Sequence, residues 1–464
     1  MGLRHAPLLR LNCRSATVLA LTALIVCLVR TPVEAALEDI LYESGRITKE
    51  EWLKAKADRE QEEARLERRL REAMVGDKAR GTKKKWVDSV VWSGDLRLRQ
   101  GQFWRYGTGA VGNDRSRQRF RIRFGPTIKM QDFKLEIRLA SGSNNSQVSA
   151  NQSFDESFSS KPIQIDRVYV AWNPGFYKPV TLTGGKMRNP FKNNYTRDVL
   201  FDSDVTPEGF AAQFTWRINP VIRLFANFGQ FVLNEEETEE RDQWLFGYEG
   251  GFEAKLVNSK LRLAVGFYDA INLDAGGIEE VTLQQFNSRL TAGDKAAAYV
   301  NDYNVLNLNG SFETEVAGLP VNIQGDWVYN TAGPVSCSGT GNSVGSCGPG
   351  NVRVDDQDEG YQVGIRLGKA RKAKTWEVAY YYKWLQADAV LSAFADSDFG
   401  DGGTNRRGNI FWIAYSFTDF LTFKTKFINT KPLERGVCTG LTGSDLAACS
   451  DDIDRLQVDM VWKF

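Results

Sequence analysis

The feature of this sequence that most restricts its fold is a two-residue alternation of apolar and polar side chains, repeated in many separate segments. It is clearest at residues 243–256, where one face carries large apolar side chains and the other carries small or charged ones. The same alternation closes the chain at residues 455–464. A period of two places successive side chains on opposite faces of a β-strand, so these segments are predicted to be strands with one apolar face.

Sixteen candidate segments reach the roughly nine residues that a tilted membrane strand requires. They start near Val90, Ser116, Asp132, Ile163, Pro179, Glu208, Val221, Gln243, Lys260, Val300, Leu319, Glu359, Thr375, Gly408, Phe420 and Asp452. Every second link between them is short, as at Gln131 and Ala317-Gly318, whereas the intervening links are mostly long, as at residues 274–299 and 330–358. Short turns at one end and long loops at the other are typical of barrels in the bacterial outer membrane.

A membrane gives this alternation a physical cause. In lipid every backbone amide must be paired within the protein, so a sheet has to close on itself. Its outward apolar side chains then meet hydrocarbon and its inward polar side chains meet water, and sixteen strands leave an aqueous lumen. We therefore predict an all-β fold, an antiparallel transmembrane β-barrel over residues 86–464, preceded by a short periplasmic α-helical segment. No segment of the mature chain has the roughly 18 apolar residues of a membrane helix.

The N-terminus has the pattern of an export signal. Three basic residues, Arg4, Arg10 and Arg14, precede an uncharged apolar run at residues 16–29, and Ala35 offers a small residue for cleavage. We predict a signal peptide at residues 1–35. The whole chain has a formal net charge of +1, and removal of this leader brings the mature chain close to −2. A near-neutral charge gives no support for nucleic acid as a partner.

Residues 36–85 are predicted to form a helical segment and linker in the periplasm. Thr48 with Glu51 three residues later makes a capping box, in which each side chain satisfies a backbone N–H of the first turn. A thin apolar stripe follows at Trp52, Ala55, Leu66, Leu70 and Met74. A coiled coil built on this stripe would join copies of the chain into a homo-oligomer such as a trimer. A solvated helix would instead act as a tether, and the sequence leaves both alternatives open.

The four mature cysteines form two close pairs in long Gly/Ser/Thr-rich links: Cys337 with Cys347 and Cys438 with Cys449. In an oxidising compartment this spacing predicts two local disulfides. A zinc site is disfavoured because the only histidine, His5, leaves with the signal peptide and neither pair has zinc-ligand spacing. We predict no metal and no cofactor.

Enzyme activity is not expected. The mature chain lacks a histidine that could act as general base. It also contains no Gly-x-Ser-x-Gly elbow, no P-loop and no dinucleotide-binding fingerprint.

Basic residues gather on the predicted inner face of the first three strands. They are Arg97, Arg99, Arg117, Arg119, Arg121, Arg123, Lys134 and Arg138. A link that holds Asp198, Asp202, Asp204 and Glu208 could supply opposing charge if it folds inward. A basic wall facing an acidic loop would create a transverse field at a constriction. Alternatively, these arginines only solvate the lumen and pair with neighbouring carboxylates.

The last strand carries Met460, Trp462 and Phe464 on one face. A terminal aromatic residue on such a strand resembles the signature that the outer-membrane barrel assembly machinery reads, which would make that machinery a partner. The alternative is a hydrophobic terminal strand that is simply buried.

Two motifs carry a resemblance to a known family. Residues 184–191 read GGKMRNPF, and residues 200–216 read LFDSDVTPEGFAAQFTW. Both resemble the bacterial "putative porin" family, with its glycine–basic–Asn-Pro-Phe strand and its following acidic segment. Residues 37–52, LEDILYESGRITKEEW, resemble the short helical opening of the same family. The likeness to phosphate-selective porins is looser and concerns architecture alone.

The resemblance implies a sixteen-stranded barrel in the outer membrane, bounded by lipid, for passive diffusion of small hydrophilic solutes with general or weak selectivity. The arginine-rich face would favour anions. The alternative function is a structural barrel with a plugged lumen, whose N-terminal helix tethers the membrane or organises a trimer.

Overall fold

The computed structural model describes residues 44–54, 56–58, 61, 65, 86–107, 114–142, 146–191, 198–235, 237, 242–273, 303–332, 357–435, 438 and 443–464. The chain divides into two units, Met1–Lys84 and Lys85–Phe464. The predicted signal peptide lies outside the described residues, as do Ala55, Leu66, Leu70 and Met74 of the apolar stripe.

Within the first unit, residues 49–54 and 56–58 are helical. The Glu51 carboxylate accepts hydrogen bonds from the Thr48 backbone N–H (2.8 Å) and hydroxyl (2.9 Å), and the Glu51 N–H donates to the same hydroxyl at 3.4 Å. The helix therefore begins with the capping box that the sequence predicts. None of the described helices is long and apolar enough to cross a membrane.

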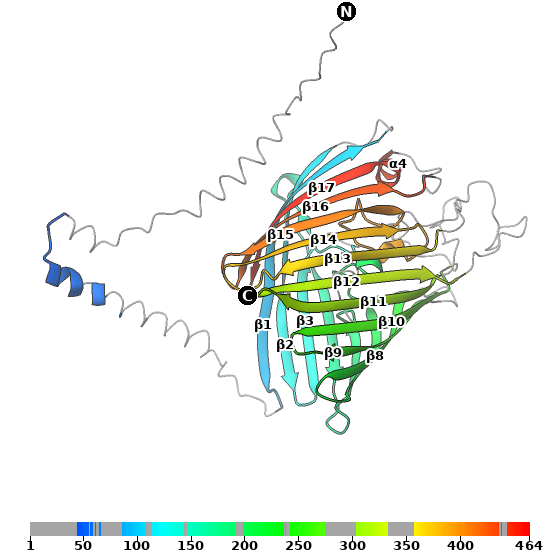
Figure 1. Cartoon of the computed structure of the whole chain (residues 1–464), viewed down its shortest axis with the longest axis horizontal. Helices are drawn as coiled ribbons and strands as arrows, with labels where there is room; N and C mark the ends of the chain where they lie inside the picture. Colours follow the sequence, from blue (N-terminus) through cyan, green and yellow to red (C-terminus); the bar gives the residue numbers. More distant parts are fainter. Residues whose placement is uncertain are drawn as a thin grey trace, which may run out of the picture. The chain divides into compact units, whose positions relative to one another are not determined.

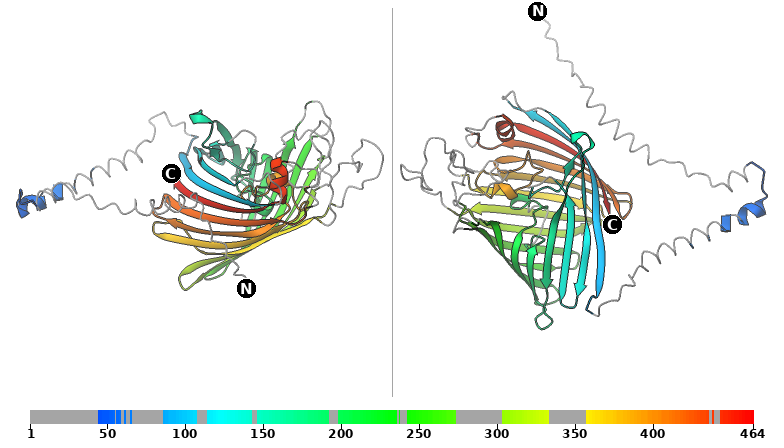
Figure 2. Two further views of the ribbon diagram at one scale, coloured as in Figure 1. Left: turned by 90° about the horizontal axis from the view of Figure 1, so that it is seen from above. Right: turned by 180° about the vertical axis from the view of Figure 1, so that it is seen from behind.

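The second unit is a closed antiparallel β-barrel (Figures 1 and 2). The strands around it are β1 (Ser89–Tyr106), β2 (Arg115–Met130), β3 (Phe133–Ser141), β5 (Ile163–Trp172), β6 (Val180–Lys186), β7 (Glu208–Arg217), β8 (Ile222–Asn234), β9 (Gln243–Lys255), β10 (Ser259–Ile271), β11 (Tyr303–Val316), β12 (Leu319–Asn330), β13 (Glu359–Gly368), β14 (Thr375–Leu385), β15 (Arg406–Ser416), β16 (Leu421–Pro432) and β17 (Asp452–Lys463).

Each of these strands pairs with its neighbour along the chain, and β1 pairs with both β2 and β17, which closes the ring. A two-residue strand, β4 (Gln152–Ser153), adds to β2 beside the ring. The prediction of a sixteen-stranded antiparallel barrel is thus confirmed for the described part of the chain, and every predicted strand start lies within three residues of the observed one.

The described parts of the long links also contain short helical elements. They are η1 (Glu156–Phe158), η4 (Ser392–Phe394) and α4 (Gly443–Ser450).

β1 and β17, the first and last strands of the chain, pair at the seam that closes the barrel. The Gly94 N–H donates to the Phe464 carbonyl at 2.8 Å, and the Phe464 N–H donates to the Gly94 carbonyl at 3.1 Å. The start of β1, the C-terminus and the short turns lie at one end of the barrel. One of those turns consists of Ala317 (φ +51°) and Gly318 (φ +78°), two positive φ values that suit a two-residue hairpin.

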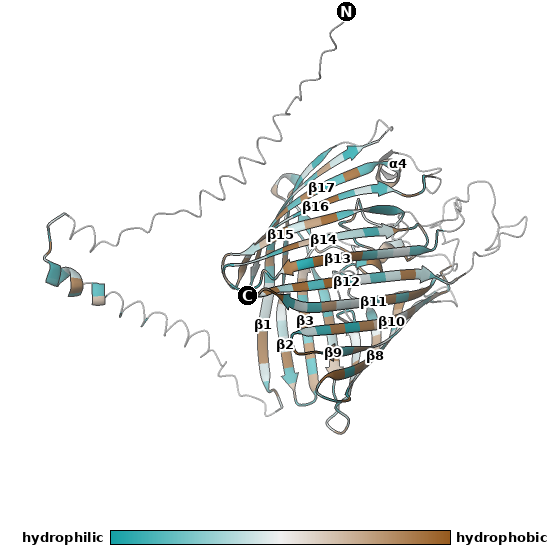
Figure 3. Ribbon diagram, in the orientation of Figure 1, coloured by the Kyte–Doolittle hydropathy of each residue, from teal (hydrophilic) through white to brown (hydrophobic). Residues whose placement is uncertain are grey.

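Hydrophobic and hydrophilic residues alternate along the strands, as Figure 3 shows. On β10, Leu263 and Val265 point outward and are 45% and 53% exposed, whereas Arg262 and Tyr268 point inward and are buried. An outer surface of exposed aliphatic and aromatic side chains is what contact with hydrocarbon requires.

Candidate functional site

The inner face of β1 and β2 carries the six arginines that the alternation predicts there. Strand pairing places Arg97 opposite Arg121 and Arg99 opposite Arg119. Like charges directly opposite one another repel, so this wall requires countercharges close by.

The barrel strands supply the first countercharges. Asp95 of β1 accepts hydrogen bonds from Arg121 (2.8 Å) and Arg123 (2.9 Å). Asp459 of β17 receives two from Arg99, at 2.6 Å from Nε and 2.8 Å from Nη2. Both contacts join side chains on the same inner face, so part of the basic wall is neutralised within the barrel itself.

A second source of countercharge is the first inward loop, between β6 and β7, whose described residues 187–191 and 198–207 fold into the barrel. Its Asp204 lies 2.9 Å from Arg123 and 3.5 Å from Arg121. Burial alone would raise the pKa of Asp204, but the Arg121 and Arg123 guanidinium groups hold that pKa below its usual value. Asp204 therefore contacts the arginines directly instead of facing them across an opening.

Among the described residues, the other three predicted acidic residues make no ion pair with the arginines of β1 and β2. Glu208 is the first residue of β7, pairs with Lys186 at 2.6 Å, and has a side chain that is 63% exposed. Asp198 and Asp202 face a second inward loop, residues 386–405 between β14 and β15. The predicted acidic face is therefore reduced, among the described residues, to Asp204.

The second inward loop supplies the countercharges that sequence reasoning missed. Its Asp398 accepts hydrogen bonds from Arg99 (3.1 Å), Arg455 (2.7 Å) and Gln457 (2.9 Å). Asp401 of the same loop pairs with Arg105 at 2.5 Å. Burial would raise the pKa of Asp398, yet the surrounding Arg99 and Arg455 charges hold it well below the usual range.

The two inward loops pack against each other inside the barrel (Figure 2). The Asp202 N–H donates to the Phe394 carbonyl at 2.6 Å, and the Asp396 N–H donates to the Asp198 carbonyl at 3.3 Å. Apolar side chains of both loops form one buried cluster with inward residues of the strands: Met187, Phe191, Val199, Leu200, Phe201, Val390, Leu391, Phe231, Leu245, Tyr268 and Tyr303. The loops thus occupy part of the lumen as one packed body.

A buried carboxyl group lies at the contact between the loops. The Ser397 N–H and hydroxyl both donate to Asp202 Oδ2 at 2.9 Å. Burial, followed by the negative charges of Asp204 and Asp396, raises the pKa of Asp202 to about 8. Loop contact is therefore coupled to protonation.

Lys134 and Arg138, the last two predicted basic residues, belong to a separate cluster on β3 and β5. Lys134 donates to the Tyr169 hydroxyl at 2.9 Å, and Arg138 pairs with Asp166. Beside them, Glu136 accepts a hydrogen bond from Arg188 at 2.8 Å. A cavity of about 970 Å³, lined in part by Asp166, adjoins this region and the first inward loop.

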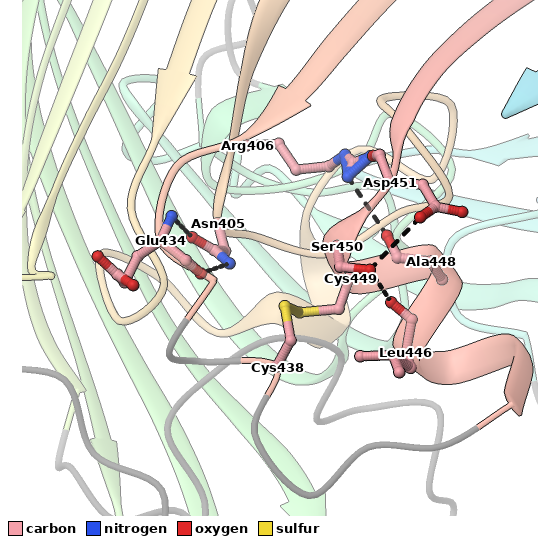
Figure 4. Close-up of a disulfide and its surroundings, with 9 residues drawn as sticks. All are labelled: Asn405, Arg406, Glu434, Cys438, Leu446, Ala448, Cys449, Ser450 and Asp451. Carbon is pink, nitrogen blue, oxygen red and sulfur yellow. Dashed lines mark hydrogen bonds between the residues drawn. A yellow bond between two sulfur atoms is a disulfide. The ribbon is translucent and has the colours of Figure 1, made fainter. Parts of the chain in front are cut away.

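A disulfide joins Cys438 and Cys449 in the link between β16 and β17 (Figure 4). These cysteines pack on Ala387, near the start of the second inward loop. At the end of that loop, Arg406 donates to the Ala448 carbonyl at 3.3 Å. Asn405 accepts a hydrogen bond from the Glu434 N–H at 2.9 Å. The disulfide-bonded link between β16 and β17 therefore contacts both ends of the second inward loop.

Cys337 and Cys347 lie outside the described residues. The C-terminal residues expected to interact with the assembly machinery alternate with the buried Arg455, Gln457 and Asp459 of β17. Met460 and Trp462 pair with Leu98 and Leu96 of β1. Among the described residues, no group of three or more His, Cys, Asp or Glu side chains could hold a metal ion.

Comparison with known proteins relates this geometry to a family. The model of a family described as "Putative porin" matches residues 103–300 and 278–464. No curated protein sequence matches the chain.

Solved structures of similar fold share little sequence with the chain. OprB of Pseudomonas putida is 11% identical over 81% of this chain and 94% of its own, with a TM-score of 0.47. OmpF of Salmonella typhi, solved with daunomycin, is 7% identical over 81% and 97%, with a TM-score of 0.45. A loop-deletion mutant of OmpT from Vibrio cholerae is 9% identical over 81% and 99%, with a TM-score of 0.43.

Proposed function

This chain belongs to the putative porin family, and we propose that it forms an outer-membrane channel through which small hydrophilic solutes diffuse passively, with a modest preference for anions. Family and fold favour a channel over an enzyme. The closed barrel provides a wall with an apolar outer face and a polar inner one.

The observation that supports the proposed preference for anions is the balance of charges on the inner wall. The carboxylates of Asp95, Asp204, Asp398 and Asp459 are each engaged by arginines. Arg97, Arg117 and Arg119 have no carboxylate within 4.0 Å among the described residues. A wall with surplus positive charge attracts anions and repels cations in a water-filled passage.

The orientation follows from the ends of the barrel. We place the short turns, the start of β1 and Phe464 on the periplasmic side, and the long links with the Cys438–Cys449 disulfide outside the cell. Residues 1–35 would be removed on export, and residues 36–85 would lie in the periplasm as an oligomerisation or tethering helix.

Three kinds of partner follow from this placement. Lipid would cover the outward apolar side chains. The barrel assembly machinery would bind Met460, Trp462 and Phe464. Further copies of the chain would form a homo-oligomer, such as a trimer.

Conductance of the purified protein in a planar bilayer with asymmetric KCl tests the proposal. We expect stepwise ohmic currents and a zero-current potential displaced toward that of chloride. Because the two inward loops fill part of the lumen, a structural barrel with a plugged lumen is the alternative outcome. Silence at all voltages, from protein that is folded by its heat-shifted mobility on a detergent gel, would favour that alternative.

A further inference from the structure

The barrel wall is interrupted between β5 and β8, beyond the short strand β6. β6 has seven residues, fewer than the roughly nine that a tilted membrane strand requires. Its pairing with β5 ends at Lys186, opposite Val168, so the first residues of β5 pair with β3 but not with β6. On the other side, β7 pairs with β8 only as far as Phe231, whereas β8 continues to Asn234. The described strands therefore leave a gap in the wall, at the end that carries the long links.

Two glycines of the sequence motifs form the edge of this gap. Gly185 (φ +116°) and Gly209 (φ +146°) lie opposite one another where β6 pairs with β7. Both φ values favour glycine, and a Cβ at Gly185 would clash with the Val168 carbonyl oxygen. Directly beyond them the Met187 N–H donates to the Pro207 carbonyl at 2.8 Å, and the chain continues as the first inward loop. The two motifs are therefore required where the wall ends and the loop begins.

The cavity of about 970 Å³ lies at this gap and is lined from both faces of the wall. Ile165, Phe210 and Val232 belong to its lining, point outward and are exposed. Phe231 and Leu245 belong to the same lining but point inward and are buried. The cavity therefore extends from the outer face of the wall to the apolar cluster behind it.

The inner end of the cavity is a group of aromatic rings that contact one another. Phe191 stacks on Phe201 with ring centres 6.4 Å apart, and it meets the edge of Phe231 at 6.2 Å. Phe394 of the second inward loop lies 6.2 Å from Phe201. All four rings line the cavity. Stacked and edge-to-face contacts are the arrangements that aromatic rings prefer, so a further ring could join this group without rearranging it.

The charged side chains of the described lining present no free charge to a ligand. Each of them is in an ion pair: Lys186 with Glu208, Asp204 with Arg123, and Asp166 with Arg138. An ion that entered the cavity would therefore be desolvated without a counterion of its own. Uncharged polar side chains also line it, among them Gln147 and Thr206. These can form hydrogen bonds with a hydroxyl or an amide group.

We propose that this cavity binds an uncharged small molecule with an aromatic body and one hydrogen-bonding end. Its size and its mostly apolar lining with a few polar groups match small-molecule sites, which occupy roughly 300 to 1,000 Å³. The aromatic body packs on Phe191, Phe201 and Phe231, and the polar end bonds to Gln147 or Thr206. The site goes beyond the proposed channel for hydrophilic solutes, and it requires a folded barrel but not an open lumen.

Photolabelling of the full-length protein in phosphatidylcholine vesicles tests the site. The probe is 4-(hydroxymethyl)benzophenone, which is uncharged, aromatic and carries one hydroxyl group. We expect saturable labelling of the peptides that contain Phe191, Phe201 and Phe231, with competition by diphenylmethanol, which is not photoreactive. The anion 4-benzoylbenzoate has the same aromatic body. Its half-saturating concentration should be about tenfold higher, because its charge would be buried without a partner.

Two valines of the outer face provide a variant and its matched control. Val232→Trp adds a large side chain to the lining and should raise the half-saturating concentration of the uncharged probe by about tenfold, because it fills space that the ligand needs. Val170 of β5 also points outward and is exposed, but it does not line the cavity. Val170→Trp should therefore leave the half-saturating concentration unchanged. An unchanged value in Val232→Trp would overturn the proposed site.

Two further results would overturn the site. Labelling that does not saturate, or that is confined to outward residues such as Phe210, would show only general contact with the membrane. Labelling of the cavity peptides in monomers but not in oligomers would assign the opening to contact with a second copy of the chain. Conductance is a separate measurement: a protein that conducts but is not labelled loses only this site, and a labelled protein that does not conduct loses only the channel function.

Discussion

At the scale of single residues, Asp398 connects several basic side chains inside the barrel. It joins the second inward loop to Arg99 of β1 and Arg455 of β17, two strands that meet at the seam. The same loop carries Asp401, which among the described residues forms an ion pair only with Arg105 and has a side chain that is 36% exposed. The two aspartates therefore form a natural comparison between a shared, mostly buried carboxylate and a half-exposed one.

Replacing Asp398 by Asn should destabilise the barrel by roughly 3 kcal/mol, because it leaves the buried Arg455 without its countercharge and removes one of the two carboxylates that pair with Arg99. Asp401→Asn should cost at most about 1 kcal/mol, the usual limit for a more exposed ion pair. Urea unfolding of the protein in detergent, followed by tryptophan fluorescence, measures both. Equal losses of unfolding free energy in the two variants would show that Asp398 contributes no more to stability than Asp401 does.

Asp202 predicts a dependence of loop docking on pH. Its pKa is about 8 when the loops are in contact, raised by burial and then by Asp204 and Asp396, and about 3.9 in an unfolded chain. Between these values the docked state holds a proton that the undocked state has lost. Docking is therefore strongest below about pH 4, weakens as the pH rises toward 8, and is constant above that.

Hydrogen exchange of residues 198–205, corrected for the intrinsic effect of pH, should show protection that falls across this window. Asp202→Asn should reduce the dependence of this protection on pH by about one proton. The other charged groups near the contact are unchanged in this variant: Asp198, Asp204, Asp396 and Lys383. Protection that increases from pH 4 to pH 8 would contradict the assignment.

The arginines of β1 and β2 could be placed from the sequence because alternation alone determines on which face of a strand each side chain lies. Their partners could not be predicted, since Asp398 and Asp204 reach them from loops whose paths depend on tertiary packing. One signal was present: the link after β14 reads ADAVLSAFADSDF at residues 387–399, which is too apolar for a loop exposed to water. Its burial against the first loop explains that composition.

At the scale of elements, the strands follow from local sequence, and the ring closes through the pairing of β1 with β17, which brings one glycine into tight contact. A Cβ added at Gly94 would lie 2.5 Å from the Arg123 carbonyl oxygen and 2.6 Å from the Phe464 ring. Glycine is required there because β1 approaches both of its neighbours closely. Gly325, on the outer face of β12, has open space around the same position and requires no such explanation.

Gly94→Ala should therefore weaken the seam by roughly 1 to 3 kcal/mol, the usual cost of overpacking. The expected result is a lower temperature for the heat-induced mobility shift on a detergent gel. Gly325→Ala is the matched control and should leave that temperature unchanged, because its added methyl group contacts nothing within 4 Å. A larger effect at Gly325 than at Gly94 would show that the seam does not limit barrel stability.

At the scale of the whole molecule, the charges of the lumen act together and no single arginine decides selectivity. Two unit charges about 10 Å apart in water interact by roughly 0.4 kcal/mol, and physiological salt screens this over about 8 Å. Several surplus charges on one wall can contribute on the order of 1 kcal/mol, which is a several-fold preference. The neutralisation of Arg121 and Arg123 by Asp95 and Asp204 keeps the expected preference modest.

Replacing Arg117, Arg119, Arg121 and Arg123 together by Gln should move the zero-current potential toward the cation side, most strongly at low salt. Part of that shift would come from Asp95 and Asp204, which the variant leaves without their partners. Adding Asp95→Asn and Asp204→Asn removes those two negative charges, so the combined variant should shift less than the quadruple one. An unshifted potential in the quadruple variant would place these arginines outside the conducting path. Equal shifts in both variants would mean that the two carboxylates do not face the permeating ions.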